Sequence, residues 1–378
     1  MRVTFDARHL QTASRVRGIG RYSRNLLAAF ARLAPADVQW TLLRLRNFPP
    51  ADPSPLPPHR DLRTLRLRRP ELSMLMLDPL LLSLELPFAR GDIYHSVQLG
   101  LPAIHRTPTV ITIHDLAPLH WPEHYLRMPH ARIGHTWQYR LAGFADHVIA
   151  VSQATGRDVI EQLGIPSERI SVIPEAVDAG FAPPPRDVAL ELVRQKWSVG
   201  SPYVLYVGQF DPRKNMDGLV SAFARAAERH TDLRLVIAGD LGKLASFLHQ
   251  ALERGRAPRD RVVLTGHVTE SELAALYAGA ECLLHAALLE GFGLTPLESL
   301  AAGTPVVGYR AGAVEEVVGA AGVLVESDRP EALGEALIGY LEDSALQQRL
   351  RAGATARAAL FSWDRAASDT LAVYRRYT

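Results

Sequence analysis

The 378-residue chain has a net charge of +2, with 47% hydrophobic and 22% charged residues. This length and composition favour two ordinary globular domains and exclude a disordered chain. One cysteine, Cys282, excludes an internal disulfide and fits a reducing compartment; its apolar neighbours indicate a buried side chain rather than a reactive thiol. The first residues lack a secretory signal, and no apolar stretch reaches the roughly 18 residues of a membrane span.

Taken in chain order, short apolar runs alternate with amphipathic stretches, a pattern typical of parallel α/β folds. In the first half we predict a helix and five strands: Tyr22–Leu33, then Val3–Phe5, Ile93–His95, Val110–His114, His147–Val151 and Ile170–Ile173. In the second half we predict six strands: Tyr203–Val207, Leu233–Ala238, Val262–Leu264, Ala280–Leu284, Pro305–Gly308 and Val323–Val325.

The predicted domain organisation follows from these elements and from the charge distribution. We expect an N-terminal domain over residues 1–178, a linker over 179–200 that contains a triple proline, a C-terminal domain over 201–360, and a helix over 361–378 that is able to pack back on the N-terminal domain. Residues 1–180 carry 21 Arg, no Lys and 16 acidic residues, whereas the rest carries 21 basic and 24 acidic residues. The two domains are therefore expected to face different partners.

One segment, Arg60–Leu86, departs from the alternation because a cluster of arginines leads into an apolar stretch. The interpretation that we favour is a buried helix with a solvated arginine face, since Asp78-Pro79 interrupts the pattern. The alternative is a helix on a membrane surface. We accordingly expect a cytoplasmic protein, with peripheral attachment to the inner face of the membrane left open.

The strongest motif is the run from Glu290 to Glu298, Glu-Gly-Phe-Gly-Leu-Thr-Pro-Leu-Glu. It follows a predicted strand and opens a predicted helix, so backbone N–H groups and the positive end of the helix dipole point at any ligand there. Such a glycine loop is typical of a phosphate site. A structural alternative remains: Thr295–Glu298 matches a capping box with proline at the first helical position, although this explains neither Glu290 nor the glycines.

With this motif the sequence resembles the retaining glycosyltransferases of family 4, whose E-x7-E motif matches Glu290 and Glu298. Tyr206–Asn215 resembles that family's first C-terminal strand and phosphate loop, and the run from Gly18 to Tyr22 resembles its acceptor-domain glycine loop. Shorter segments resemble the mannosyltransferase-B-like branch of polysaccharide biosynthesis, at residues 92–96, 113–116, 151–153 and 361–363.

The resemblance implies an α/β protein of the GT-B fold, in which two Rossmann-like, doubly wound parallel-sheet domains face each other across a cleft. It implies that Glu290 contacts donor hydroxyls, Glu298 the ribose, and His114 the sugar. Lys214, which is one of three lysines, would neutralise the diphosphate with Arg213. The implied catalytic residues are His114, Lys214 and Glu290, and the implied donor-binding residues are Gly18, Gly20, Gln209, Arg213, Lys214, Val268, Glu290, Gly291, Phe292, Gly293, Leu294, Thr295 and Glu298.

The expected activity is retaining hexosyl transfer from a nucleotide diphosphate sugar, with GDP-mannose as the favoured donor, to a glycan or lipid-linked saccharide in cell-surface polysaccharide assembly. The expected mechanism is front-face displacement, and no metal or other cofactor is expected because Lys214 and the helix N-terminus would stabilise the leaving group. Alternatives are a UDP- or dTDP-sugar transferase of the same fold, an epimerase or phosphorylase, and a non-catalytic nucleotide-sugar-binding subunit. Nucleic acid is not an expected partner.

The sequence also departs from the family pattern at several positions. Gln209 stands where many relatives have an arginine, and Thr295 replaces a common proline. The run from Glu175 to Asp178, Glu-Ala-Val-Asp, replaces the more usual Asn-Gly-Val-Asp, and the run from His285 to Ala287 replaces Pro-Ser. None of these changes removes a motif acid or Lys214, so an active enzyme is still expected.

Overall fold

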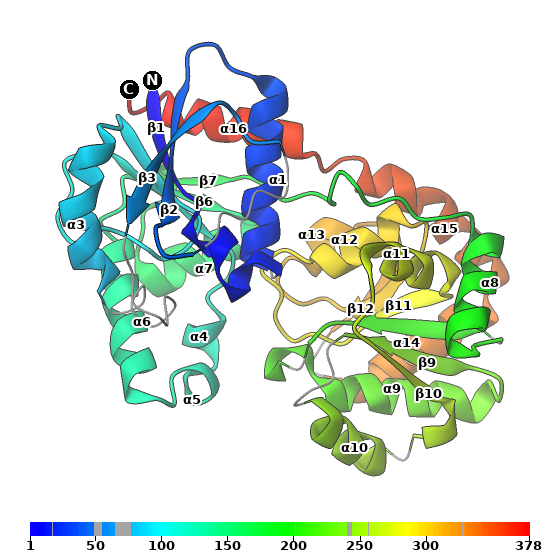
Figure 1. The fold of residues 1–378 in the computed structure, drawn as a ribbon. Helices are drawn as coiled ribbons and strands as arrows, with labels where there is room; N and C mark the ends of the chain where they lie inside the picture. Colours follow the sequence, from blue (N-terminus) through cyan, green and yellow to red (C-terminus); the bar gives the residue numbers. More distant parts are fainter. Residues whose placement is uncertain are drawn as a thin grey trace. The chain divides into compact units, whose positions relative to one another are not determined.

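The computed structural model describes the whole chain except residues 17, 49–54, 65–76, 201, 210, 240–243, 256 and 327–328. The chain folds into two compact units (Figure 1). Unit 1 contains Met1–Asp178 and Ser362–Thr378, and unit 2 contains Ala179–Phe361. The last helix of the chain thus belongs to the same unit as the first strand.

Unit 1 contains a seven-stranded parallel sheet in the order β3-β2-β1-β4-β5-β6-β7. Its strands are β1 (Arg2–Asp6), β2 (Gln39–Leu45), β3 (His59–Thr64), β4 (Ile93–Ser96), β5 (Thr109–Ile113), β6 (His147–Ala150) and β7 (Ile170–Val172). The five strands predicted from apolar runs are present, within one or two residues at each end. Two further strands, β2 and β3, form one edge of the sheet and were not predicted.

Helices surround this sheet: α1 (Gly18–Leu33), α3 (Asp78–Ala89), α4 (Ala117–His120), α5 (Pro122–Tyr125), α6 (Pro129–Ala142), α7 (Gln153–Leu163) and α16 (Trp363–Tyr374), with 3-10 turns η1 (Arg8–Gln11), η2 (Ala13–Val16) and η3 (Ser167–Arg169). Helix α16 packs against α1, as Figure 1 shows. The Trp363 ring meets the Tyr22 ring edge-on at 5.5 Å, and the Tyr374 hydroxyl is hydrogen-bonded to His95 of β4.

The segment Arg60–Leu86 is not one helix, contrary to the favoured prediction. Its first residues belong to the edge strand β3, and its last residues belong to α3, where Pro79 occupies the first turn and so does not interrupt a helix. The apolar run at residues 72–76 lies outside the described residues. The β3 stretch is polar because an edge strand keeps one side in water, and its Asp61 neutralises the nearly buried Arg44 of β2 at 2.9 Å.

A buried ion cluster lies at the carboxyl end of β1. The Arg8 guanidinium lies 2.6 Å from an Asp6 oxygen and 2.8 Å from an Asp78 oxygen, and these three side chains are at most 1% exposed. The Tyr94 hydroxyl donates a further hydrogen bond to Asp6. Burial alone would raise the pKa of Asp6, but Arg8 lowers it to about 2. Because Asp78 opens α3, the cluster attaches that helix to the sheet.

Unit 2 contains a six-stranded parallel sheet in the order β10-β9-β8-β11-β12-β13. Its strands are β8 (Tyr203–Val207), β9 (Arg234–Ala238), β10 (Val262–Gly266), β11 (Cys282–His285), β12 (Val306–Tyr309) and β13 (Gly322–Val325). All six were predicted. Cys282 is fully buried, and burial raises the pKa of its thiol, in agreement with the prediction of an unreactive side chain.

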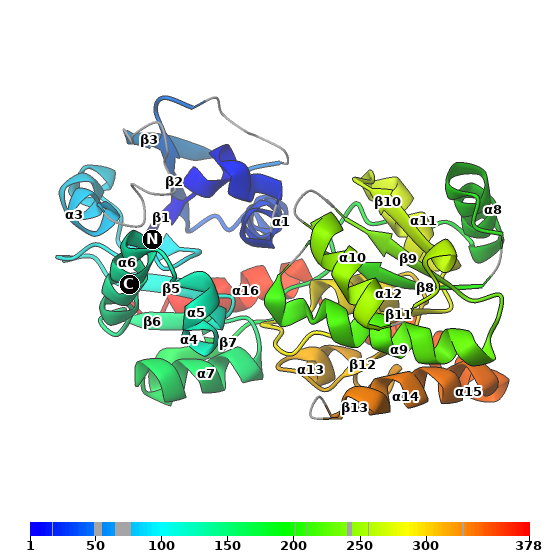
Figure 2. The ribbon, with the colours of Figure 1, turned by 90° about the horizontal axis from the view of Figure 1, so that it is seen from below.

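The helices of unit 2 lie on both faces of its sheet: α8 (Arg186–Trp197), α9 (Met216–Arg229), α10 (Leu244–Arg254), α11 (Glu270–Gly279), α12 (Leu294–Ala301), α13 (Val314–Val318), α14 (Pro330–Glu342) and α15 (Ser344–Ala358), with 3-10 turns η4 (Pro212–Lys214) and η5 (Arg259–Arg261). Helices α9 and α14 lie side by side (Figure 2). The core beneath them includes Val204 and Tyr206 of β8, whereas the neighbouring Tyr203 donates a hydrogen bond to α11 on the other face.

Much of the predicted linker over 179–200 is therefore structured. Helix α8 occupies its centre and packs against α11, with Ala189 and Val193 fully buried. This helix was not predicted because charged residues interrupt its apolar residues in the sequence. The triple proline directly precedes α8. This position is compatible with the helix, because proline is well tolerated just before and within a first helical turn.

Candidate functional site

The candidate site of unit 2 lies at the carboxyl ends of β8 and β11, which are neighbours in the middle of the sheet. The strand order reverses here, because β9 follows β8 on one side and β12 follows β11 on the other. In open α/β sheets such a switch point is where ligands bind. The loop after β8 carries Arg213 and Lys214 on η4, and the loop after β11 carries Glu290.

These two loops bring together charged residues that are 76 positions apart. The Lys214 Nζ donates a hydrogen bond of 2.5 Å to Glu290 Oε2, and an Arg213 nitrogen lies 3.6 Å from the same oxygen. The loops are also joined by their backbones, since the Leu288 N–H donates to the Arg213 carbonyl at 2.7 Å. The three charged side chains retain 12–17% exposure. The structure therefore brings two of the predicted cations and one motif acid together.

The environment of Glu290 keeps it ionised. Burial would raise the pKa of Glu290, but the charges of Lys214 and Arg213 outweigh burial and lower this pKa to about 2. His285, at the end of β11, lies 3.8 Å from Glu290 and is 5% exposed. Burial and Lys214 lower the pKa of His285 to about 4, so the ring is neutral at neutral pH. Sequence reasoning noted His285 as a departure from the family pattern but did not place it beside Glu290.

The glycine run of the motif forms the start of α12. Gly293 is the N-cap residue with φ of 105°, which a residue with a side chain rarely adopts, and Leu294 and Thr295 form the first turn. The capping-box alternative is wrong, because the helix begins before Thr295 and the cap makes no side-chain hydrogen bond. Glu298 is instead 1% exposed and accepts a hydrogen bond of 2.9 Å from the Tyr277 hydroxyl.

A second glycine close to Glu290 was missed by sequence reasoning. Gly312, after β12, has φ of 57°, and a side chain there would come within 2.3 Å of the Glu290 carbonyl oxygen. The adjacent Ala313 N–H donates to this same carbonyl at 3.0 Å. The backbone of Glu290 is thus held from a neighbouring strand end. In the sequence this glycine lies between two alanines and belongs to no recognised motif, so it was not predicted as part of the site.

The other donor-binding candidates of unit 2 occupy varied surroundings. Gln209 is exposed after β8, and Val268 is half-buried between β10 and α11. Phe292 is 6% exposed, with its ring edge-on to Phe361 at 5.7 Å. The Phe292 side chain therefore packs in the core, and only its backbone remains for a ligand. Gly291 is buried in the same turn.

The remaining candidates, Gly18, Gly20 and His114, belong to unit 1. His114 directly follows β5, and the Tyr22 ring of α1 meets its ring edge-on at 4.8 Å. The sequence predicted a glycine loop here, but Gly18 and Gly20 lie in the first turn of α1. A side chain at Gly20 would come within 2.3 Å of the Ser14 carbonyl oxygen, which gives this glycine a packing role, whereas no atom crowds the corresponding position at Gly18.

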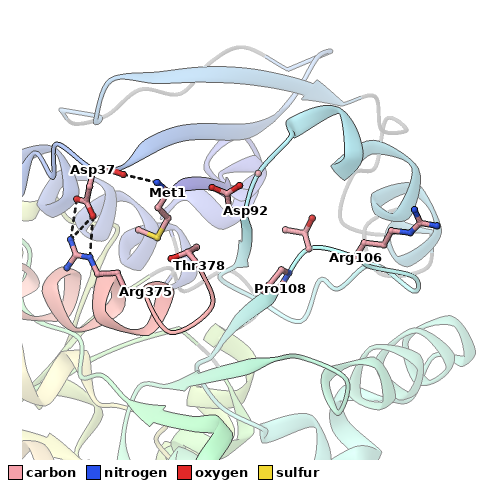
Figure 3. Close-up of a pocket in the computed structure, with 9 residues that line it drawn as sticks. Met1, Asp37, Asp92, Arg106, Pro108, Arg375 and Thr378 are labelled. Atoms are coloured by element: carbon pink, nitrogen blue, oxygen red, sulfur yellow. Dashed lines mark hydrogen bonds and ion pairs between the residues drawn. The ribbon is translucent and has the colours of Figure 1, made fainter.

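A hollow of about 800 Å³ lies elsewhere in unit 1, as Figure 3 shows. Met1, Asp92 and Pro108 line it directly before β1, β4 and β5, at the amino ends of these strands. Arg375 and Asp37, which also line it, form an ion pair at 3.2 Å. Because sites in parallel α/β sheets form at the carboxyl ends, this hollow is not the candidate site. Within the described part of the chain, no three His, Cys, Asp or Glu side chains are grouped as metal ligands.

Two family models match the chain. The model described as Glycosyltransferase Family 4 matches residues 16–181, and the model described as Glycosyl transferases group 1 matches residues 191–357. The O-antigen chain mannosyltransferase B of Escherichia coli is 28% identical over 288 residues, which cover 75% of this chain and 74% of that protein.

A D-inositol 3-phosphate glycosyltransferase of Xylanimonas cellulosilytica is 32% identical over 289 residues, which cover 74% of this chain and 67% of that protein. Among solved structures, Anabaena HepE in complex with UDP and glucose has a TM-score of 0.76 at 19% identity, with both chains covered completely. That likeness concerns the fold. The chain therefore belongs to the glycosyltransferases that these two family models describe, and it has the GT-B fold of two Rossmann-like domains.

Proposed function

We propose that this glycosyltransferase moves a hexose, with mannose from GDP-mannose favoured, from a nucleotide diphosphate sugar to a glycan or lipid-linked saccharide, with retention of anomeric configuration. The likeness to O-antigen chain mannosyltransferase B supports mannose and cell-surface polysaccharide assembly. The observation that carries the proposal is the cluster of Lys214, Arg213 and Glu290 beside the start of α12.

In the proposed reaction the acceptor hydroxyl attacks the anomeric carbon on the face from which the diphosphate departs. The new C–O bond forms as the bond to the phosphate oxygen breaks, and the hydroxyl proton passes to that oxygen. Lys214, Arg213 and the amides at Gly293 and Leu294 would stabilise the growing charge of the diphosphate. Glu290, released from Lys214, would hold the donor hydroxyls, while Glu298 would bind the ribose and His114 the sugar.

We further propose that the reaction needs no divalent metal. Two cations and a helix N-terminus already converge where the diphosphate would lie, and these groups supply the charge that a metal would otherwise provide. The measurement is turnover in the presence of EDTA, compared with turnover after Mg²⁺ or Mn²⁺ is added back. Activity that disappears with EDTA and returns with a metal contradicts this part of the proposal.

The experiment that tests the donor is a transfer assay with GDP-mannose, UDP-glucose, UDP-galactose and dTDP-glucose, in which a methyl α-mannoside and a phosphoinositol serve as acceptors. Turnover with GDP-mannose and the mannoside is expected. The one-bond carbon–proton coupling at the new anomeric carbon then reports retention or inversion. Turnover with only a UDP or dTDP sugar would show that GDP-mannose is not the donor. Transfer to the phosphoinositol would indicate an acceptor like that of the inositol-glycosyltransferase relatives instead.

A binding measurement separates an enzyme from a non-catalytic subunit. Each nucleotide sugar is added without metal and the melting temperature is followed, because a ligand that binds the folded state raises it. A rise without turnover for any donor and acceptor indicates a binding subunit. Conversion of the nucleotide sugar without an acceptor indicates an epimerase, and no rise with any of them contradicts the proposal.

We also propose that unit 1 contacts an anionic membrane surface. Residues 124–145, which include α6, contain no Asp or Glu, and they expose Met128, Ile133, Trp137 and Phe144 between arginines. A basic helix with exposed aromatic residues suits a lipid interface. Helix α3 likewise exposes Leu80, Leu84 and Phe88. Within the described residues, none of the helices is long and apolar enough to cross a membrane.

Sedimentation with lipid vesicles tests this contact. The protein is expected to bind vesicles that contain phosphatidylglycerol and to stay in solution with phosphatidylcholine alone. Replacing Ile133 and Trp137 with serine should abolish binding, whereas replacing Leu190 and Leu192, which are exposed on α8 of unit 2, should not. Equal binding by both double variants contradicts the assignment of α6.

A further inference from the structure

The loop that carries Glu290 is held from both of its neighbouring loops. Strand β11 lies between β8 and β12 in the sheet, so the loops that follow these two strands flank the loop that follows β11. From the β8 side, an Arg213 side-chain nitrogen donates a hydrogen bond of 3.2 Å to the Leu289 carbonyl. From the β12 side, the Ala313 N–H donates one of 3.0 Å to the Glu290 carbonyl. Two successive carbonyls of the loop are therefore fixed by two different elements.

Gly312 makes the contact on the β12 side possible. A Cβ atom at this position would lie 2.3 Å from the Glu290 carbonyl oxygen and 3.0 Å from the Glu290 backbone nitrogen. These are backbone atoms, which do not give way as the end of a flexible side chain does. The φ of 57° is also a left-handed conformation that glycine adopts without strain. Any larger residue at position 312 must therefore push the two loops apart.

Helix α13, which follows Gly312 directly, is fixed at its far end by Arg357 of α15. The Arg357 Nε donates a hydrogen bond of 2.9 Å to the Val317 carbonyl, and the same guanidinium donates to the Glu316 carbonyl. Carbonyls at a helix C-terminus lack partners within the helix, and a basic side chain is one of the groups that satisfy them. The loop that meets Glu290 thus continues into a helix whose end is held in place.

Arg357 also supports the motif by a second route. Its guanidinium lies 5.5 Å from the centre of the Phe361 ring, and this ring meets the Phe292 ring edge-on at 5.7 Å. Phe292 follows Glu290 by two positions in the buried turn of the motif. The backbone of the turn is therefore supported through α13 at Glu290 and through an aromatic pair at Phe292, and both routes lead to one arginine.

The groups proposed for the diphosphate are held independently of the Gly312 loop. In η4, the Asp211 side chain accepts a hydrogen bond of 3.1 Å from the Arg213 N–H, and the Asp211 carbonyl accepts one of 2.9 Å from the Lys214 N–H. Neither hydrogen bond involves the loop after β12. A displacement of that loop is therefore expected to move the Glu290 carboxylate more than it moves the cations of η4.

We propose that Gly312, with Ala313 and α13, positions Glu290 for the hydroxyls of the donor sugar, so that the loop after β12 sets the affinity for the sugar and not that for the nucleotide diphosphate. This inference rests on the proposed contact of Glu290 with the donor hydroxyls. The strength of a hydrogen bond falls steeply with distance and angle, so a carboxylate that serves a sugar must be held in place. Gly312 and Ala313 act through Glu290 and are positioning residues.

Equilibrium binding of GDP and of GDP-mannose to the wild type and to Gly312→Ala tests this role. Both ligands contain the nucleotide and the diphosphate, so the ratio of their dissociation constants reports on the sugar. In Gly312→Ala the Kd of GDP-mannose should rise about 10-fold relative to that of GDP, as expected when a hydrogen bond to a charged group weakens. The kcat should fall about 10- to 100-fold, because a shift of about 1 Å misplaces the sugar.

The same substitution in a Glu290→Ala background separates positioning from a general loss of structure. Without the carboxylate, Gly312→Ala should cause no further change in the ratio of dissociation constants. Its methyl group still meets the backbone of residue 290, so the fall in melting temperature should persist. An equal change of the ratio in both backgrounds overturns the proposal, and so does a Gly312→Ala enzyme with the wild-type ratio and kcat.

Gly164→Ala is the matched control. Gly164 ends α7 in unit 1 with a similar φ of 66°, and no atom lies within 4 Å of the position of its Cβ. The substitution imposes the same kind of backbone strain without a collision, so the ratio and kcat should keep their wild-type values. A control that changes the ratio as much as Gly312→Ala does would assign the effect to strain and overturn the proposal.

If Gly312→Ala does not fold, Arg357→Met tests the same support without adding an atom beside Glu290. It releases the end of α13, and the ratio and kcat should change in the same direction; unchanged values overturn the proposal. If the transfer assay identifies another donor, that nucleotide sugar and its nucleotide diphosphate are the two probes. A wild type that binds no nucleotide sugar contradicts the proposed function, whereas normal transfer by both variants contradicts the role of Gly312 alone.

Discussion

Two ion clusters of the molecule, one in each unit, consist of similar groups and differ in their access to water. In unit 1, Arg8 and its two aspartates are at most 1% exposed. In unit 2, Glu290 and its two cations keep 12–17% of their side chains exposed, at a strand switch point beside a helix N-terminus. Both clusters hold a carboxylate with a pKa of about 2.

The difference separates a structural cluster from the proposed functional one. No ligand reaches a fully buried pair, so the Arg8 cluster can only stabilise the fold. An ion pair at an accessible strand end can exchange one of its partners for a ligand. A strongly lowered pKa marks both places equally and therefore does not distinguish them.

The largest effect is expected for Arg8→Met, which tests the structural half of this comparison. The change leaves two buried carboxylates unpaired and should lower the free energy of unfolding by about 3–5 kcal/mol. Denaturant unfolding measures it. Arg2→Met is the control, because its pair with Asp92 is half-exposed and should matter little. A loss of turnover in Arg8→Met without a loss of stability would break the comparison.

The next effect is expected for Lys214→Ala, at the functional cluster. The kcat should fall about 100- to 1000-fold through the loss of charge stabilisation, while Arg213 remains near Glu290 and limits the loss of stability. The measurement is kcat beside a melting curve. Arg225→Ala, which breaks an exposed pair with Glu335 in the same unit, should change neither. A variant that unfolds but turns over normally when folded would contradict the functional assignment.

The pH dependence of stability extends the comparison to the two whole units. Burial, which is the main cause, lowers the pKa values of His9, His95 and His147 in unit 1 to about 4, 3 and 4, and that of His285 in unit 2 to about 4. These folded-state values lie below the unfolded value of 6.5, so the unfolded chain binds more protons between pH 6.5 and 4. The stability that neutral histidines contribute is complete above pH 6.5 and is lost as pH falls through this window.

Each buried histidine should lose on the order of 1–2 kcal/mol at pH 5. Unit 1 has three of them, so it should open first on acidification. Hydrogen exchange at pH 7 and pH 5, resolved by mass spectrometry, measures this for each unit. Asp6 and Glu290 add to the loss only below about pH 4. In that range the unfolded chain protonates these two carboxylates, whereas the folded chain keeps them ionised down to a pKa of about 2. The exposed His249 is a control whose replacement by asparagine should change nothing. Earlier opening of unit 2 would contradict the expectation.

The smallest effect extends the comparison from charges to glycines. Gly20→Ala should lower the free energy of unfolding by about 1–3 kcal/mol because its new methyl group meets the η2 backbone. Gly18→Ala has room and should change stability by less than about 0.5 kcal/mol. If the Gly18 backbone contacts the donor, its variant should instead raise the donor KM. An unchanged KM for Gly18→Ala removes this residue from the donor site.

The sequence predicted those parts of the fold that are locally apolar. Buried central strands such as β8 consist of hydrophobic residues and were recognised directly. Strand β3 was missed because its polar residues suit an edge, and β2 was missed because Arg44 interrupts its apolar pattern. The charge of Arg44 is neutralised by Asp61 on the neighbouring strand, a pairing that emerges only when the strands lie side by side.

The same distinction holds for the sites. The motif identified Glu290 and Glu298 because their loop and helix are one local unit. The contacts of Lys214 with Glu290 and of Glu175 with His114 join residues 76 and 61 positions apart, and no local pattern encodes them. A departure from the family pattern marked Glu175 and His285 as unusual, but their partners became visible only in the folded chain.

The return of α16 to unit 1 has a consequence for synthesis on the ribosome. Its Trp363 and Tyr374 complete the core against Tyr22 and His95, and Tyr377 donates a hydrogen bond to the Asp146 carbonyl. Domains usually fold in the order in which they emerge. Here the earlier-made unit lacks part of its interior until the final residues appear, so the later-made unit is free to fold first.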